Sequence, residues 1–213
     1  MDERPERLLF VAGTGTEVGK TWVAAHLLAA LARRGLRVSA RKPAQSFGPD
    51  EGATDAEVLG AASGEAPELV CPRHRWYEVP MAPPMAADAL GRPPIAIADL
   101  AAEIAFDRRV DVGLVEGAGG VRSPLAHDGD IVELGVSLQP DAVVLVADAG
   151  LGTINAVVLS VSALDRWPVH VLLNRYDDGD VLHSANRRWL TDRFGLDVSV
   201  DIEALADRVV DRR

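Results

Sequence analysis

Apolar residues are grouped along this chain in two different ways. Short uninterrupted apolar runs are typical of buried strands, and longer segments with apolar residues at three- and four-residue spacing are typical of helices. The predicted strands cover residues 8–12, 36–40, 112–115, 142–147 and 169–173. The predicted helices cover residues 22–34, 54–63, 85–90, 99–106, 154–164, 184–194 and 203–210. This alternation predicts an α/β fold, a mostly parallel β-sheet with helices on both faces.

The segments between these elements favour turns. Residues 43–53 contain Gly, Pro and acidic residues and are predicted to form a loop, and the Pro-rich residues 64–84 are predicted to be irregular. Thr54 and Glu57 have the spacing of a capping box, which would begin the helix predicted over residues 54–63. No repeat, low-complexity tract or linker divides the sequence, so its 213 residues are expected to form one domain, 1–213.

A glycine-rich segment joins the first predicted strand to the first predicted helix and ends in Gly-Lys-Thr. This arrangement is typical of a phosphate-binding loop, so the predicted fold is P-loop NTPase-like. The curled backbone would present N–H groups to phosphate, Lys20 would add a charge near the β and γ phosphates, and the Thr21 hydroxyl would bind Mg²⁺. A plain turn is the alternative. The loop residues expected to contact the nucleotide are Gly13, Thr14, Gly15, Glu17, Val18, Gly19, Lys20 and Thr21.

Other polar residues follow the ends of the predicted strands. Lys42, Glu116, residues 150–155 and Asn174 each come after a different strand. Ligands bind at the carboxyl ends of the strands in open α/β sheets, so one site can collect all of these residues. A carboxylate such as Glu116, followed by a glycine-rich turn, suits Mg²⁺ and close backbone approach to an anion. Taken singly, the turn could be an ordinary surface turn and Lys42 a solvated side chain.

Composition narrows the class of protein. The hydrophobic fraction of 48% suits a sizeable core, and no apolar run approaches the ~20 residues of a membrane span. The net charge of −10 argues against nucleic-acid binding, which depends on Lys and Arg. Residues 1–7 are charged and lack an apolar signal region, and the single cysteine, Cys71, cannot form an internal disulfide. We therefore expect a cytoplasmic protein that binds neither membranes nor nucleic acids.

Several motifs in one order resemble the dethiobiotin synthetase family. The resemblance runs from about residue 8 to residue 174, and the early position of Gly13 in the loop belongs to the family pattern. The other matching segments are Lys42-Pro43-x-x-Ser46, Thr54-Asp55, residues 115–120, residues 151–155 and Asn174.

The resemblance implies an activity. Members of this family are single-domain homodimers that use Mg·ATP, CO₂ and 7,8-diaminopelargonate to make dethiobiotin in biotin synthesis. One amine captures CO₂ as a carbamate, whose oxygen attacks the γ-phosphate of ATP. The second amine then displaces phosphate and closes the ureido ring. Phosphoryl transfer of this kind depends mainly on positioning and charge stabilisation.

The resemblance also implies roles for individual residues. Catalysis would involve Lys20, Lys42, Thr16 and Ser46. Mg²⁺ would be held by Thr21, Asp55 and Glu116. The nucleotide would also contact Glu116, Gly117, Gly119 and Asn174, the last at the adenine edge. Substrate and carbamate would contact Lys42, Ser46, Gly117, Ala118 and Gly119. Gly152 and Asn155 match the segment that receives the substrate carboxylate across the dimer interface.

Three features depart from the family pattern. Gly15 replaces an acid that is often present in the loop, and Met85 stands where many members have His. Residues 196–201 lack the Gly-x-x-Pro-like ending that helps enclose the nucleotide base. These departures leave base preference and full activity open.

Other functions were weighed against this resemblance. Partitioning and septum-positioning ATPases carry an extra Lys at the position of Gly15, and cobyrinic acid amidases need a glutaminase domain that this chain is too short to hold. Two further alternatives stay open at this point. One is a paralogue that acts on another substrate, and the other is a non-catalytic nucleotide-binding regulatory module.

Overall fold

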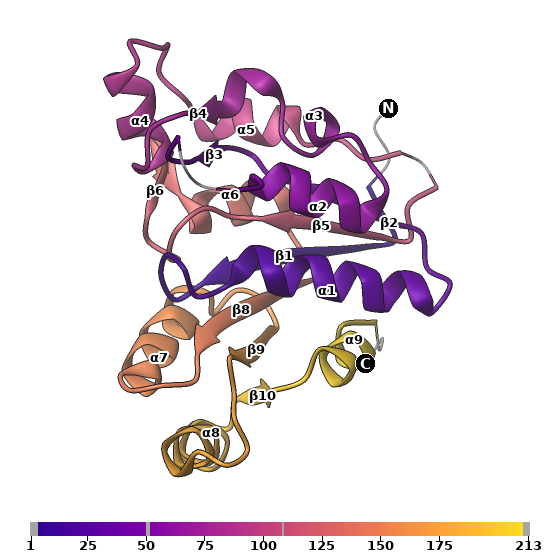
Figure 1. The fold of residues 1–213 in the computed structure, drawn as a ribbon, viewed down its shortest axis with the longest axis vertical. Coiled ribbons are helices and arrows are strands. Elements are labelled where there is room, and N and C mark those ends of the chain that lie inside the picture. Colours follow the sequence, from indigo (N-terminus) through magenta and orange to yellow (C-terminus); the bar gives the residue numbers. More distant parts are fainter. Residues whose placement is uncertain (1–3, 50–51, 108, 211–213) are drawn as a thin grey trace.

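Six parallel strands form the central sheet of this protein in a computed structural model that describes residues 4–49, 52–107 and 109–210 (Figure 1). The order across the sheet is β10-β9-β8-β1-β5-β2, and every neighbouring pair is parallel. The predicted α/β fold class is therefore confirmed. The strands are β1 (Arg7–Gly13), β2 (Val38–Arg41), β5 (Val112–Glu116), β8 (Ala142–Asp148), β9 (Val169–Asn174) and β10 (Asp197–Ser199).

A few residues used in the sequence analysis lie outside the described part of the chain. They are residues 1–3 of the charged N-terminal segment, residues 50 and 51 of the predicted loop, residue 108, and the C-terminal residues 211–213 of the proposed domain.

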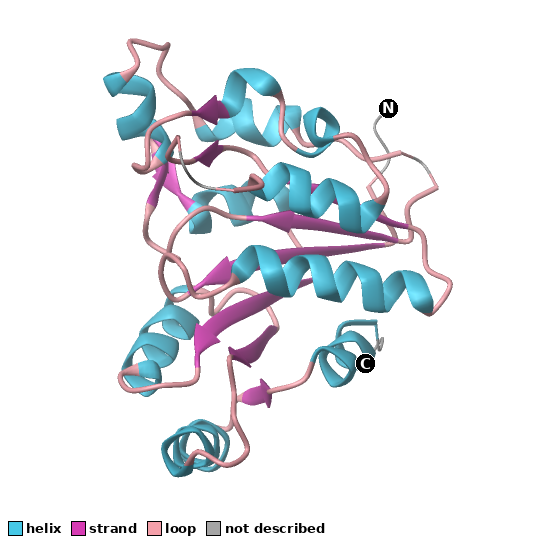
Figure 2. Ribbon diagram, viewed as in Figure 1, coloured by secondary structure: helices cyan, strands magenta, loops and turns pink. Residues whose placement is uncertain are grey.

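Helices cover both faces of the sheet (Figure 2). Successive residues of β1 point to opposite faces, so that Leu9 and Val11 join one buried cluster while Leu8 and Phe10 join the other. The first face is covered by α1 (Lys20–Arg33), α2 (Asp55–Ser63), α3 (Pro67–Val70) and α9 (Ile202–Val210). The second is covered by α4 (Pro83–Ala89), α5 (Ile97–Glu103), α6 (Ile131–Leu138), α7 (Thr153–Ala163) and α8 (Val181–Phe194).

Two short sheets stand beside the central one. Strands β3 (Gln45–Ser46) and β4 (Trp76–Tyr77) pair in parallel, and β4 directly follows the 3₁₀-helix η1 (Arg73–Arg75). Strands β6 (Pro124–Ala126) and β7 (Gly129–Asp130) pair antiparallel. Strand β3 follows β2, and β6 follows the turn after β5. Both small sheets therefore begin beyond the carboxyl ends of strands of the central sheet.

The predicted elements are present, with boundaries moved by capping contacts. The capping box at Thr54 is confirmed: its Oγ1 accepts from the N–H of Glu57, whose carboxylate accepts from the N–H of Thr54. The helix predicted over 99–106 begins at Ile97 instead, because Asp128 Oδ1 accepts from the Ile97 N–H at 2.8 Å. The helix predicted over 184–194 begins at 181, because Asp180 caps it. Such contacts shift an element by two or three residues.

The second strand also begins later than predicted, at residue 38 rather than 36. The Leu36 N–H donates to the Leu31 carbonyl at the end of α1, and the Arg37 N–H donates to Asp111. Both residues therefore belong to the connection between α1 and β2. Smaller shifts of one or two residues affect the helices predicted over 22–34, 85–90, 154–164 and 203–210.

Two predictions about irregular segments were wrong. Residues 64–84 contain α3, η1, β4 and the start of α4. Pro67 and Pro83 occupy the first turns of α3 and α4, where a missing N–H costs nothing, so these prolines begin helices. The loop predicted over 43–53 contains β3, and α6, β6, β7 and β10 were not predicted.

Glu65 ties the end of α2 to β2. Its carboxylate accepts hydrogen bonds from Ser39 Oγ, the Ala40 N–H and Arg41 Nη1, at 2.7, 2.9 and 2.8 Å. Burial alone would raise the pKa of Glu65, but these hydrogen bonds lower it below its ordinary value. This tie fixes the strand that leads directly to Lys42.

Candidate active site

A cleft of about 520 Å³ opens where β1, β2 and β5 end. Its walls come from the loop after β1, the residues after β2, the start of α2, and the turn after β5. The predicted convergence of the ends of β1, β2 and β5 on one cleft is confirmed, but residues 150–155 and Asn174, which the same prediction included, do not line it. The predicted site residues that line the cleft are Thr16, Glu17, Gly19, Lys20, Thr21, Lys42, Ser46, Asp55, Glu116, Ala118 and Gly119.

The loop between β1 and α1 folds around the side chain of Lys20. Lys20 is the first residue of α1 and is buried, and its Nζ donates to the Gly15 carbonyl at 2.9 Å. A Cβ on Gly13 would lie 2.9 Å from Lys20 Cδ, so glycine at this position leaves room for the lysine stem. The early position of the first glycine thus has a packing reason. Thr14 continues the sheet by donating its N–H to the Val146 carbonyl.

Gly19 ends the loop in the left-handed region, with φ of 90°. A Cβ there would lie 2.1 Å from Asn174 Nδ2, so only glycine fits this position. The Asn174 Nδ2 donates to the Val18 carbonyl at 3.0 Å. The end of β9 therefore packs directly on the phosphate-binding loop.

The turn after β5 packs on the same loop from the other side. The Gly117 N–H donates to the Val11 carbonyl of β1, and the Gly120 N–H donates to Ser123 Oγ at 2.8 Å. Gly120 lies next to Thr14 and Gly15. The two glycine-rich segments therefore form adjacent walls of one cleft.

Four side chains form a polar cluster at the cleft floor, in which Lys42 and Glu116 are buried and Thr21 and Asp55 are partly exposed. Lys42 is 2% exposed, and its Nζ lies 2.5 Å from Asp55 Oδ2 and 2.6 Å from Glu116 Oε1. Thr21 Oγ1 lies 2.7 Å from Asp55 Oδ1 and 2.9 Å from Glu116 Oε1. Glu116 is fully buried, and its Oε2 has no hydrogen-bond partner among the described residues. Lys20 and Lys42 are the only lysines in the sequence.

Burial and charge act together on the cluster. Burial lowers the pKa of Lys20, and the neighbouring charge of Lys42 lowers it further. Burial alone would also lower the pKa of Lys42, but the charges of Asp55 and Glu116 outweigh it and raise that pKa. Burial would raise the pKa of Asp55, yet Lys42 holds it below its ordinary value. Burial raises the pKa of Glu116.

The donor set fits Mg²⁺ that arrives with a nucleotide. Thr21, Asp55 and Glu116 offer oxygen ligands, and the unpartnered Glu116 Oε2 is an acceptor that a cation would satisfy. Among the described residues, no group of three or more His, Cys, Asp or Glu side chains could hold a metal ion. Mg²⁺ at nucleotide sites is bound by one or two carboxylates together with substrate phosphates, so two carboxylates and a hydroxyl suffice.

Some cleft residues had no signal in the sequence analysis. Gln45 is 2% exposed, accepts the Ala56 N–H through Oε1, and leaves its Nε2 without a partner among the described residues. It braces the first turn of α2, which carries Asp55. Ser46 was predicted from its motif, but its contact was not: Ser46 Oγ donates to the Met81 carbonyl at 2.5 Å, joining β3 to the segment before α4. A long-range contact of this kind leaves no periodic pattern to detect.

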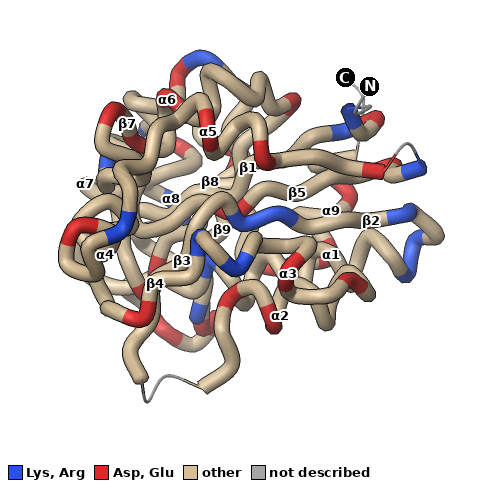
Figure 3. Tube along the Cα trace, turned by 90° about the horizontal axis from the view of Figure 1, so that it is seen from above, with Lys and Arg blue, Asp and Glu red and all other residues tan. Residues whose placement is uncertain are grey.

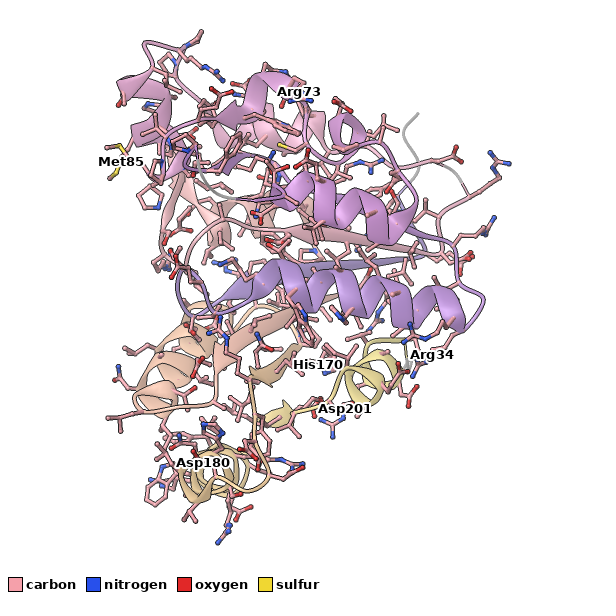
Figure 4. All side chains as sticks on the ribbon, viewed as in Figure 1. Arg34, Arg73, Met85, His170, Asp180 and Asp201 are labelled. Carbon is pink, nitrogen blue, oxygen red and sulfur yellow. The ribbon has the colours of Figure 1, made fainter. Side chains whose placement is uncertain are left out.

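Other predicted site residues lie outside the cleft lining. Thr14, Gly15, Val18 and Gly117 belong to its two turns but do not line it, and neither do Gly13 and Asn174. Gly152 and Asn155 lie at the start of α7, away from the cleft residues. Their roles toward adenine and across a dimer stay predictions. Met85 is 55% exposed and points outward from α4 (Figure 4), so the structure does not bring it into the cleft.

The surface outside the cleft carries mixed charge. Lys and Arg are interspersed with Asp and Glu along the described chain (Figure 3). At the end of α1, Arg34 donates to Glu203 and Asp207 of α9, near the labelled Asp201 (Figure 4). In the part of the chain that the structure describes, no helix is both long enough and apolar enough to span a bilayer.

Comparison with known proteins agrees with this geometry. Residues 7–207 match the AAA domain family. The chain is 41% identical over 196 residues to the ATP-dependent dethiobiotin synthetase BioD of Anaeromyxobacter dehalogenans, covering 88% of this chain and 86% of the relative. It is 40% identical over 166 residues to the protein of that name from Corynebacterium efficiens, covering 78% and 73%. The corresponding protein of Haloferax mediterranei is 38% identical over 193 residues, covering 88% and 80%.

Solved structures share the fold at low sequence identity. The signal recognition particle receptor FtsY from Elizabethkingia anophelis has a TM-score of 0.53 and 14% identity, covering 98% of this chain and 67% of that one. The septum site-determining protein MinD from Pyrococcus horikoshii, complexed with Mg-ADP, has a TM-score of 0.51 and 17% identity, covering 91% and 78%. At these identities the likeness shows the P-loop NTPase fold alone.

Proposed function

The chain belongs to the ATP-dependent dethiobiotin synthetase family, and we propose that it converts 7,8-diaminopelargonate, CO₂ and ATP to dethiobiotin, ADP and phosphate. The main structural support is the polar cluster of Lys42, Asp55, Glu116 and Thr21 beside the phosphate-binding loop. It places a cation, two carboxylates and a hydroxyl beside the phosphate-binding loop, where a transferred phosphoryl group would lie.

The loop and Lys20 would bind the nucleotide phosphates. The backbone N–H groups of residues 15–19 and the start of α1 favour anions, whereas the Thr14 N–H is already bonded to the Val146 carbonyl. In the structure the Lys20 ammonium bonds to the Gly15 carbonyl, and a phosphate oxygen would be a stronger, charged partner for it. Its lowered pKa and burial make an anionic partner more favourable still. Asn174 would read the adenine edge from the end of β9.

Thr21, Asp55 and Glu116 would hold Mg²⁺ directly or through water. Bound there, the ion would neutralise phosphate charge and orient the phosphates for in-line attack. The two carboxylates also hold Lys42, which fixes the ammonium at the cleft floor. Asp55 and Glu116 would therefore position both the Mg²⁺ ion and the Lys42 ammonium.

The chemistry needs no covalent bond to the protein. One amine of the substrate forms a bond to the carbon of CO₂ and loses a proton, giving a carbamate. A carbamate oxygen attacks the γ-phosphorus, and ADP leaves with the bonding electrons. Lys42 would stabilise the negative charge shared by the carbamate and the γ-phosphate, and Thr16 of the phosphate-binding loop lines the same cleft. The second amine then attacks the carbonyl carbon, phosphate leaves, and the ureido ring closes.

Ser46 and the turn after β5 would hold the reacting amines and carbamate. The Ser46 hydroxyl donates to the Met81 carbonyl, so its oxygen remains free to accept from a substrate amine. The N–H groups of Ala118 and Gly119 would hold the carbamate oxygens, whereas the Gly117 N–H already donates to the Val11 carbonyl, so the predicted contact of Gly117 would not be made through its N–H. This orientation would bring the two reacting ends of the substrate to one point, which is the main source of rate in such reactions.

We also propose that the protein is a homodimer in which α7 faces its partner. Leu151, directly before α7, is 93% exposed, and Leu159 on the same helix is 63% exposed. Gly152 and Asn155 would then reach the substrate carboxylate bound in the other subunit. Sedimentation of the protein as a monomer at assay concentrations would contradict this proposal, and Leu151→Asp is expected to dissociate a dimer.

A cytoplasmic location is part of the same proposal. Cys71 is a buried free thiol, which suits a reducing compartment. Detection of the native protein in an extracytoplasmic fraction of its host cells would contradict it.

Phosphate release from Mg·ATP, measured with bicarbonate and with or without 7,8-diaminopelargonate, tests the proposed activity. Dethiobiotin is followed in the same samples by mass spectrometry. We expect release that requires the diamine and equals the dethiobiotin formed. Nucleotide binding without any response to the diamine would contradict the proposal and favour another substrate or a non-catalytic role.

A further inference from the structure

Arg175, which directly follows β9, links the phosphate-binding loop to the end of β8. Its Nη2 donates to the Glu17 carbonyl at 2.9 Å, and its Nη1 lies 3.0 Å from Asp148 Oδ2. Asp148 ends β8, and its Oδ1 accepts the Gly150 N–H at 2.9 Å. Arg175 directly follows β9 and is not among the cleft-lining residues. It therefore contacts the loop without lining the cleft itself.

Glu17 needs an external contact more than its neighbours do. Its φ is 60°, a left-handed conformation that is unfavourable for a residue with a side chain. Arg175 has φ of 56° and shares this strain. In the described chain only one other residue besides glycine, Gln139, has a positive φ, and it caps the end of α6. Two strained residues, Glu17 in the loop and Arg175 directly after β9, are thus joined by a hydrogen bond.

Asn174 and Arg175 together contact three successive loop residues. Asn174 holds the Val18 carbonyl and packs against Gly19, while Arg175 holds the Glu17 carbonyl. The carbonyl and the N–H of one peptide group point in opposite directions. Because the Glu17 and Val18 carbonyls are held on the side of β9, the N–H groups of the residues that follow them point away from β9. Contacts of this kind would keep the loop in its anion-binding shape before any nucleotide arrives.

We infer that Arg175 is a positioning residue that holds Glu17 in its strained conformation and thereby raises nucleotide affinity. The inference rests on the nucleotide binding in the proposed function but not on the identity of the amine substrate. The ion pair with Asp148 is exposed at both side chains, 60% and 47%, and exposed pairs contribute little to folding stability. Its effect is therefore expected in nucleotide binding rather than in the melting temperature.

Binding of MgADP, measured by titration calorimetry, tests this role through a double-mutant cycle. Arg175→Ala is expected to weaken binding about 5- to 30-fold, equivalent to about 1–2 kcal/mol. The same substitution is made in a Glu17→Ala background, which removes the side chain but keeps the strain. It is also made in a Glu17→Gly background, which removes both. We expect the full loss in the alanine background and less than about twofold loss in the glycine background.

The outcomes separate this inference from the proposed function. Equal losses in the alanine and glycine backgrounds would overturn the positioning role, as would an Arg175→Ala variant that binds MgADP as tightly as the wild type. In either case a wild type that binds MgADP and forms dethiobiotin would leave the proposed function intact. A wild type that binds no MgADP would overturn both. A drop of several degrees in the melting temperature of the nucleotide-free Arg175→Ala variant would indicate a general structural role instead.

Discussion

Replacing Lys42 with methionine removes the positive charge that lies between two carboxylates at the cleft floor. The substitution keeps the length of the side chain, so its packing changes little. Lys42 is 2% exposed, and its Nζ lies within 2.6 Å of both Asp55 and Glu116. Glu116 is fully buried, and after the change its oxygens would retain only the Thr21 hydroxyl as a donor among these contacts.

The structure sets the expected size of two separate effects. Removing one partner of a buried ion pair costs about 3–5 kcal/mol, and the partial exposure of Asp55 favours the lower end. At about 2–4 °C per kcal/mol for a chain of this size, a loss near 3 kcal/mol should lower the melting temperature by about 6–12 °C. Turnover should fall by at least about 10²–10³, because Lys42 would stabilise charge that develops during phosphoryl transfer.

The assay compares Lys42→Met with Arg109→Met, which removes a cation from an exposed pair with Asp107. The control is expected to change both stability and turnover little. MgADP affinity should change less than tenfold in Lys42→Met, since Lys42 is assigned to the γ-phosphate and the carbamate. A folded Lys42→Met variant with kcat within tenfold of the wild type would refute the assignment of Lys42.

Three further predictions follow from individual contacts. Gly19→Ala should abolish MgADP binding, because its Cβ would lie 2.1 Å from Asn174 Nδ2; unchanged affinity by calorimetry would contradict the loop geometry. Burial raises the pKa of the Cys71 thiol to about 12, so the native protein should not react with a thiol reagent at about pH 8 until denaturant is added, and rapid native labelling would contradict its burial. Glu65→Gln should lower the free energy of unfolding by about 2–3 kcal/mol near neutral pH through loss of the charge that Arg41 pairs with. Because the folded pKa of Glu65 is lowered, the difference between wild type and variant should be full above the unfolded pKa and shrink as pH falls through the folded one; a difference that does not change with pH in denaturant titrations would contradict this.

Much of the fold was predictable because its signals are local. The core strands β1, β5, β8 and β9 are rich in apolar residues, and Thr54 with Glu57 marks the start of α2 within four residues. Helix α6 was not predicted, although Asp130 and Glu133 give it the local signal of a second capping box. The start of α5 could not be predicted, because its cap is the distant Asp128.

The site shows the same division between local and distant information. Lys20, Lys42, Asp55 and Glu116 were predicted because each belongs to a motif at a strand or helix end. Their convergence on one cleft follows from the parallel sheet. Gln45 acts by accepting the Ala56 N–H in another segment, and Arg175 acts by donating to the Glu17 carbonyl, which is distant in sequence. Neither residue belongs to a motif of its own.

Transfer of labelled oxygen tests most directly whether the site directs a carbamate oxygen at the γ-phosphate. Enzyme, Mg·ATP and 7,8-diaminopelargonate in unlabelled water are mixed with C¹⁸O₂ and quenched within a single turnover. Phosphate and dethiobiotin are then analysed by mass spectrometry. The mechanism predicts one ¹⁸O atom in the released phosphate and one in the ureido carbonyl of dethiobiotin. Dethiobiotin formed together with unlabelled phosphate would contradict the attack that Lys20 and Lys42 are proposed to support.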